Sequence, residues 1–477
     1  MMRIYEKTVI YIFLPIIFIL VIGLEPVSGA DNASKAPAPL QLTLKDAVSL
    51  ALKSNRNIIA AANTTRSSQY SVQAARSDFD FKYRPSANIG AAEAGEILGA
   101  GVLFEKQTHF GPRFQLTPLV SRSGESTYGL VDMSIQIPLL RGWGKTVNED
   151  SINQSAFAER TSARGLHQAR EDTVLQTITE VYGIIEQKEL VRLLEEQVRV
   201  MAVHTETARM KKRVELATAM DVYRALLRLK DVQDSLSTTK RRLSESRNRL
   251  KRIIAVSMDQ PIEVTTTYRY QPASVSLDAA IDQALKNRSE IDQARDALSE
   301  AERRVTVAEH NLKPELNLRF DYERLAADAD FGFSIDEPED RWQINLVSST
   351  DWVRAREKAN YRKRLLDLEN LRLRLQSLQD EIISEVRNQF EILESEQARI
   401  RIKKEQIRQA RGKQKLSRIK FNHSMADNFD LIEAEAELFQ ARAGLLNVKT
   451  AYIINKYRLK AIMGKLLNQR GKLEFAL

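Results

Sequence analysis

An internal duplication is the feature that most constrains how this chain folds. Residues 44–79 and 277–312 carry the same apolar pattern at one constant offset, so that Leu44 falls on Leu277. The shared positions recur at steps of three and four, which describes one face of a helix. We therefore expect one helical segment, called the cassette here, to occur twice.

A second repeated segment widens the duplication to nearly the whole chain. At a shorter offset, three residues match three others: Asp221, Ala225 and Leu229 match Asp430, Ala434 and Leu438. The shorter offset means that the first half carries extra residues between its two repeated pieces. The sequence therefore predicts two tandem halves, residues 42–270 and 271–470.

The N-terminus has the pattern of a secretory signal over residues 1–30, with basic residues, an apolar run and small residues ending at Ala30. An uncleaved anchor helix is the alternative, but Pro15 inside the apolar run favours cleavage. We expect an extended leader over 31–41 and a C-terminal tail over 471–477.

The composition excludes several classes of protein. The chain has no cysteine, which excludes disulfides, thiolate zinc sites and a lipidated N-terminal cysteine. Its net charge of +9 would suit nucleic acid, but an exported chain rarely meets that partner. No segment after the signal has the ~20 apolar residues of a membrane helix, so a crossing by the mature chain requires strands.

Two stretches alternate apolar and polar residues as strands do. The first predicted hairpin covers about 84–140, with one strand at 131–137, a partner between 85 and 102, and a long exposed loop between them. The second covers about 314–350. A half-buried soluble sheet shows the same alternation. Four strands offer too little sheet to cover so helical a protein, and they cannot close a barrel alone, so membrane strands require oligomerisation.

The remaining segments predict unusually long helices. Residues 145–260 contain no proline, and continuous helices are expected from Lys145 to Lys212 and from Val353 to Lys420. Each would extend about 100 Å at ~1.5 Å per residue. Together with return helices they form the predicted pairs 145–256 and 353–466.

Catalytic, cofactor and metal signals are absent from the sequence. The five histidines are scattered, and no nucleophile elbow, phosphate loop or metal-ligand spacing occurs. No catalytic, cofactor-binding or metal residue is predicted, and the chain is not expected to be an enzyme.

Two charged stripes remain to be explained. A basic stripe recurs at helical spacing and comprises Arg401, Lys404, Arg408, Arg411, Lys415 and Arg418. An acidic face follows the next turn at Asp430, Glu433 and Glu437. An antiparallel fold places 415–418 opposite 431–434. The stripes are either solvated faces with weak ion pairs or, on the acidic side, a ring that selects cations at a pore mouth.

The assembled pattern resembles the TolC-like outer-membrane efflux protein family, also called outer membrane factors, over essentially all of the chain after the signal. The motifs that carry the resemblance are Leu44-x-x-Ala-x-x-x-Ala-Leu, its copy at Leu277, Ile137-Pro138-Leu139-Leu140-x-Gly142 and Asp430-Leu-Ile-Glu433-Ala. Their duplication in this order makes them specific, although each alone is weak.

The resemblance implies a mostly α fold with membrane β: long helical hairpins form a periplasmic tunnel, and each subunit adds four strands to a twelve-stranded barrel. It implies a homotrimer in outer-membrane lipid, fed by an inner-membrane pump of RND or ABC type through a periplasmic adaptor (membrane fusion protein). By motif position, Asp430 and Glu433 ring the periplasmic entrance and Asp221 joins the gate. The adaptor-contacting tips are Val214, Glu215, Leu216, His423, Ser424 and Met425.

Some positions depart from the family pattern. Glu215 and Ser424 stand where the tips usually carry glycine, Phe421 replaces a tyrosine, and Ala426 replaces an arginine that closes the entrance by pairing with the acid at Asp221. The family's entrance lock is therefore expected to be absent or rewired.

Two functions from different classes compete. The first is a passive trimeric duct of a tripartite efflux or type I secretion system in the outer membrane. The second is a periplasmic coiled-coil adaptor or scaffold that never enters a membrane. They differ over the alternating runs near 131–137 and 316–322, which an adaptor would not need for membrane residence. A nucleic-acid-binding coiled coil would rest on the basic stripe alone.

Overall fold

The structure is a computed structural model. It describes residues 38–92, 95–123, 126–266, 268, 271–272, 275–327, 339–423, 425 and 427–467. The predicted signal peptide at 1–30 and tail at 471–477 lie outside these residues. Pro39–Leu477 forms one compact unit, and the elements below belong to it.

Each cassette consists of two helices, which corrects the prediction of a single helix. The first copy is α1 (Leu44–Ser54) and α2 (Arg56–Ser77), and the second is α6 (Leu277–Asn287) and α7 (Ser289–His310). The chain is extended at Asn55 and Arg288, which occupy the same place in the two copies.

Polar side chains explain where three of the four cassette helices, α1, α2 and α6, begin. The Asn55 side chain accepts hydrogen bonds from the backbone N–H groups of Asn57 and Ile58 at 2.9 and 3.3 Å. It therefore starts a new helix where the sequence periodicity alone indicated continuation. The Thr43 and Ser276 side chains cap α1 and α6 in the same way.

The long helices form two antiparallel hairpins. The first is α4 (Asp150–Arg213) with α5 (Ala219–Ile253), and the second is α8 (Ala355–Asn422) with α9 (Asn428–Ile462). The helix predicted to begin at Lys145 is interrupted at Glu149. A separate short helical turn, α3 (Lys145–Asn148), precedes α4. Of the helices in the described part of the chain, none is long and apolar enough to cross a membrane.

The core lies between the helices in three clusters. One lies beneath α1 and joins α4 to α5 through Ile178 and Leu250; a short parallel pair, β1 (Leu40–Leu42) with β6 (Ile262–Val264), adds to it. The second joins α6, α8 and α9 around Ile382 and Tyr452. The third, near Met201, packs α4, α5 and α9. Each fully buried aliphatic side chain contributes about 2 kcal/mol of hydrophobic free energy.

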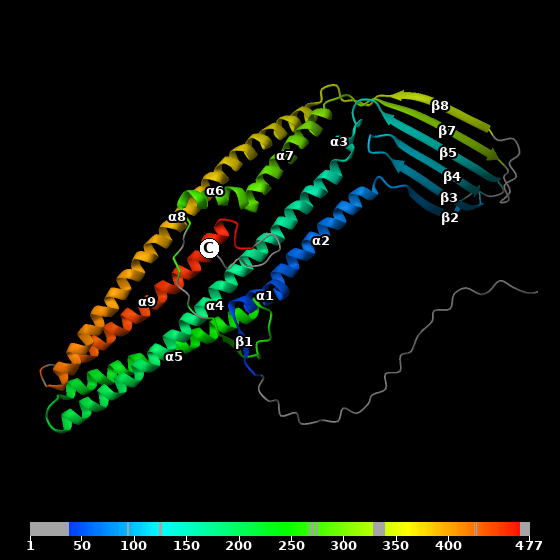
Figure 1. Ribbon diagram of the computed structural model, residues 1–477. Coiled ribbons are helices and arrows are strands. Elements are labelled where there is room, and N and C mark those ends of the chain that lie inside the picture. Colours follow the sequence, from blue (N-terminus) through cyan, green and yellow to red (C-terminus); the bar gives the residue numbers. More distant parts are fainter. Residues whose placement is uncertain are drawn as a thin grey trace, which may run out of the picture. The chain divides into compact units, whose positions relative to one another are not determined.

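The strands form one antiparallel sheet with the order β2-β3-β4-β5-β7-β8. Their bounds are β2 (Lys82–Ala92), β3 (Gly95–Gln107), β4 (Arg113–Ser123), β5 (Ser126–Pro138), β7 (Asn317–Ala327) and β8 (Glu339–Val347). Figure 1 shows the sheet beyond the ends of α2, α4, α7 and α8. In the described residues the sheet therefore has six strands and not the predicted four.

The missed strands lie where the sequence analysis expected an exposed loop. The single predicted hairpin at 84–140 is two hairpins, β2–β3 and β4–β5. Gly99, Gly101 and Pro118 led to the wrong prediction, because these residues usually mark turns. Here each sits within a strand, Gly99 and Gly101 in β3 and Pro118 in β4.

Candidate functional site

The two faces of the sheet differ sharply in polarity at the end nearest the helices. Hydrogen-bonded neighbours form rows across all six strands, and adjacent rows point to opposite faces. One row is entirely apolar or aromatic: Tyr83, Phe104, Leu116, Met133, Tyr322 and Trp342. The next row is entirely polar: Lys82, Glu105, Gln115, Ser134, Asp321 and Gln343.

The apolar face is open to its surroundings. Tyr83 and Trp342 are each 70% exposed, and Ile89 is 81% exposed. An exposed apolar surface this wide is unfavourable in water. Apolar side chains outward and polar side chains inward are the arrangement of strands that cross a bilayer.

The junction between sheet and helices is rigidly bonded. The turn after β3 contacts the chain entering α4, because the Gly144 N–H donates to the Phe110 carbonyl at 2.9 Å. His109 Nδ1 lies 2.8 Å from a Glu149 carboxylate oxygen, and its ring stacks on Phe79. Gly111 has φ +120°, and a Cβ there would lie 2.5 Å from the Gly142 carbonyl oxygen. Only glycine fits that contact.

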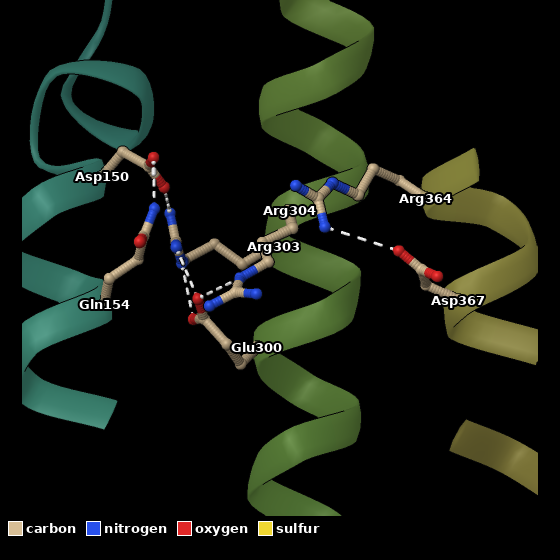
Figure 2. Close-up of polar contacts among 7 residues, drawn as sticks. All are labelled: Asp150, Gln154, Glu300, Arg303, Arg304, Arg364 and Asp367. Carbon is tan, nitrogen blue, oxygen red and sulfur yellow. Dashed lines mark hydrogen bonds and ion pairs between the residues drawn. The ribbon is translucent and has the colours of Figure 1, made fainter. Parts of the chain in front are cut away.

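An ion-pair network fixes α7 against α4 (Figure 2). Arg303 of α7 bonds the Asp150 carboxylate of α4 at 2.5 Å and Glu300 at 2.7 Å, and Arg304 also bonds Glu300 at 2.8 Å. Burial opposes ionisation of Glu300, but the two guanidinium groups outweigh it and lower its pKa. The network holds adjacent helices in register beside the sheet.

At the far end of the helices, two turns form the predicted tips. In the α4–α5 turn the Leu216 N–H donates to the Lys211 carbonyl at 2.8 Å and the Glu215 N–H donates to the Lys212 carbonyl at 3.1 Å. This pattern requires a left-handed residue, and Glu215 has φ 58°. The departure from glycine therefore leaves the turn geometry intact.

The second tip has the same closing bond. The Met425 N–H donates to the Lys420 carbonyl at 2.8 Å, and His423 is exposed. The predicted tip residue Ser424 and the neighbouring Ala426 lie outside the described residues. Large apolar side chains project from the tips: Val214, Leu216 and Met425 are 64%, 70% and 78% exposed.

Asp221, a predicted gate residue, holds the start of α5. Its carboxylate accepts hydrogen bonds from the Thr218 hydroxyl at 2.7 Å and the Thr218 N–H at 2.9 Å. These bonds lower the pKa of Asp221 and keep it ionised. At the equivalent start of α9, the Asp427 carboxylate accepts a hydrogen bond from the Asp430 N–H at 3.0 Å. The side chain of Asp430 is exposed.

Glu433, the third predicted gate residue, has a cationic neighbour that the sequence analysis missed. Lys413 of α8 lies 3.8 Å from Glu433 and 2.8 Å from Glu437. Glu437 and, more weakly, Glu433 raise the pKa of Lys413. The predicted pairing of 415–418 with 431–434 already places residue 413 opposite these acids, so the signal was present.

A buried carboxylate behind the acidic face was also missed. Glu435 is only 6% exposed and accepts hydrogen bonds from Gln414 at 2.8 Å and Arg418 at 2.9 Å. Arg418, a member of the basic stripe, therefore pairs with Glu435 across the hairpin of α8 and α9. The spacing of charges cannot show which carboxylate turns inward.

Two grooves near the tips share Asp221 in their lining. One, of about 460 Å³, lies between α5 and α9 and includes Asp221 and Glu433 in its lining. The Arg224 guanidinium lies 5.8 Å from the centre of the Phe429 ring there. The other, of about 690 Å³, includes Leu216, Met425 and Asp221.

Phe421 has a partner in the second groove. Lys211 Nζ lies 3.6 Å from the centre of the Phe421 ring. The contact joins the two hairpins at the position where the family pattern has tyrosine. Among the described residues, no group of three or more histidine, aspartate or glutamate side chains is arranged to hold a metal ion.

Comparisons with known proteins agree with this geometry. Residues 280–465 match the family model "Outer membrane efflux protein". No curated protein sequence matches the chain. The fold is similar to the outer-membrane channel OprN, with 16% identity, a TM-score of 0.68, and coverage of 88% of this chain and 90% of that one.

Two further solved structures share the fold. The Campylobacter jejuni CmeC outer membrane channel has 16% identity and a TM-score of 0.68, over 91% of this chain and 87% of that chain. The open state of the Neisseria gonorrhoeae MtrE outer membrane channel has 16% identity and a TM-score of 0.63, over 89% of each. Residues 280–465 therefore match the outer membrane efflux protein family, and the chain has the fold of these outer-membrane channels.

Proposed function

We propose that three copies of this chain form a passive duct through the outer membrane and into the periplasm. The observation that carries the proposal is the sheet with an exposed apolar face, attached to helices of 64 and 68 residues. The sheet supplies the membrane segment, and the helices extend about 100 Å away from it at ~1.5 Å per residue.

An exposed apolar stripe supports the assembly of several copies. Met220, Tyr223 and Leu227 follow one another at helical spacing on α5 and are 58%, 62% and 66% exposed. A neighbouring subunit would cover them, and three subunits would place three copies of each tip around one axis.

The tips are proposed to contact a periplasmic adaptor. Their exposed residues Val214, Leu216 and Met425 are apolar, which suits docking of another helical tip. Glu215, His423 and Ser424 complete the proposed contact surface. The sequence has no recognisable nucleotide-binding motif. An inner-membrane pump of RND or ABC type would therefore supply the energy for transport.

The acids near the tips are proposed to form the entrance gate. Asp430 has an exposed carboxylate, Glu433 shares a groove with Asp221, and Lys413 reduces the net charge of the acidic face. Charges repeated three times around a narrow aqueous mouth favour cations.

Replacing Asp430 and Glu433 together with serine is expected to lower cation selectivity. In planar bilayers the cation-to-anion permeability ratio should fall about twofold or more, because each subunit loses two carboxylates at the mouth. Reversal potentials in a salt gradient measure this ratio.

A matched control removes the same charge away from the tips. Asp234→Ser with Glu245→Ser acts on exposed carboxylates further along α5 and should leave the ratio unchanged. If the tip variant also leaves the ratio unchanged, the gate assignment is wrong, while the channel proposal stands.

A further inference from the structure

We infer that the trimer closes an eighteen-stranded barrel, six strands from each subunit, by pairing β8 of one copy with β2 of the next. The inference rests on the proposed trimer and goes beyond it, because the resemblance implied twelve strands. It assigns the exposed edge of β2 a specific occupant, which is the β8 edge of a second copy.

The additional hairpin has the same two faces as the rest of the sheet. Tyr83 and Phe104 extend the apolar row, and Lys82 and Glu105 extend the polar row. A hairpin that folded away from the membrane would not need apolar and polar faces aligned with those of the neighbouring strands. The hairpin therefore belongs to the same membrane surface as β4–β8.

The direction of the strands allows closure. Neighbouring strands alternate in direction across the sheet, so that β2 leads away from the helices and β8 leads back toward them. The β8 edge of one copy and the β2 edge of the next are thus antiparallel, the pairing that completes a barrel without an open edge.

The outermost helices and the outermost strands lie at the same two edges of the subunit. In the helical layer α2 packs on α4, α4 on α7, and α7 on α8. The outer helices of this layer are continuous in sequence with the outer strands, since α2 leads into β2 and β8 leads into α8. A neighbouring copy that packs α2 against α8 would bring the two strand edges together.

The widths of the two layers also agree. Four helices spaced ~9 Å apart occupy about 36 Å. Six strands spaced ~4.8 Å apart and tilted by ~40° occupy about 38 Å, whereas four would occupy only about 25 Å. Six strands per copy therefore continue the helical layer without constriction, and the barrel has about twice the cross-section of a twelve-stranded one.

The absence of natural cysteine permits a clear cross-linking test. Lys82 and Gln343 lie at the two ends of one row, and in a tilted barrel the next copy is displaced along the strand by about six residues. A displacement of about six residues in the opposite direction from Lys82 would fall before the start of β2. We therefore combine Gln343→Cys with Ser86→Cys or Asn88→Cys.

Directly opposed strand residues meet the distance requirement of a disulfide. After oxidation of outer membranes, most chains of at least one double variant should run as covalent dimers and trimers that resist boiling and disappear on reduction. Each single variant should remain monomeric after boiling. Gln343→Cys with Asp321→Cys, an adjacent pair within the sheet, is the control for oxidation.

The competing twelve-stranded arrangement gives a different product. It would place β8 beside β4 of the next copy, so Gln343→Cys would link to Leu119→Cys or Ser121→Cys. That link, or a trimer in which neither pair of edges links, would overturn the inference while leaving the trimer intact. Loss of the trimer itself, seen without boiling in the unmodified chain, would instead contradict the proposed function.

Discussion

Replacing Glu171 with glutamine is expected to raise the free energy of unfolding by about 3 kcal/mol at pH 8. Glu171 is buried in α4, and burial together with the charge of Glu290 raises its pKa to about 7. From an ordinary pKa of 4.5, that shift corresponds to about 3 kcal/mol at 1.36 kcal/mol per unit.

The sign of the pH dependence follows from this raised pKa. Below about pH 4.5 the carboxyl is protonated in both the folded and the unfolded chain, and its stabilising contribution is fully present. That contribution is lost as the pH rises through about 7, because folding then requires burial of a charge. Arg288 only partly offsets the cost. Burial lowers the pKa of His167, whose Nε2 lies 3.7 Å from the carboxylate, so at pH 8 this imidazole is neutral and adds no positive charge beside Glu171.

Guanidinium titrations of the detergent-solubilised protein, followed by helical circular dichroism from pH 4 to 8, measure the effect. The stability difference between Glu171→Gln and the unmodified chain should vanish near pH 4 and grow toward pH 8. Glu206→Gln, at an exposed position of the same helix, is the control and should show little change. A constant difference across this range would contradict the buried environment of Glu171.

Gly464→Ala is the second substitution with a large expected effect. Gly464 follows α9 with φ +63°, and a Cβ there would lie 2.8 Å from the backbone oxygen of Asn287. The left-handed conformation costs a side chain ~1–2 kcal/mol and the clash adds a similar amount, so unfolding should become easier by about 3 kcal/mol. The same guanidinium titration measures the loss.

The first half of the chain offers a matched control. Ala255 ends α5 as Gly464 ends α9, with φ 54° and the same closing bond, from the Val256 N–H to the Lys251 carbonyl at 3.0 Å. Ala255→Gly should therefore be neutral or slightly stabilising. Equal effects of the two substitutions would show that the contact with Asn287 does not distinguish the sites.

The sequence predicts the helices and the second hairpin because their periodicities are uninterrupted. Leu44 and Leu277 begin patterns that hold for three helical turns, and Trp342 to Leu346 alternate strictly. Such patterns follow from burial of one face and depend little on distant contacts. The breaks at Asn55 and Arg288 were missed because each new helix restarts after a single extended residue, which preserves the apolar spacing on both sides.

The missed hairpin and the missed tip contacts have different causes. Gly99 and Gly101 have no side chain to show alternation, and their place in the sheet depends on pairing with β2 and β4. The contacts of Lys413 and Arg418 depend on the rotation of α8 against α9, which sequence spacing does not determine. The acidic face of Asp430 and Glu433 was predictable because a spacing of three places both residues on one side of the same helix.

The most direct test of the proposed duct is the apparent size of the protein from the outer-membrane fraction, compared on a denaturing gel with and without boiling. We predict a trimer in that fraction that dissociates to a monomer only on boiling, because a shared barrel resists detergent. A soluble periplasmic species, monomeric and unaffected by boiling, would contradict the account and favour an adaptor or scaffold.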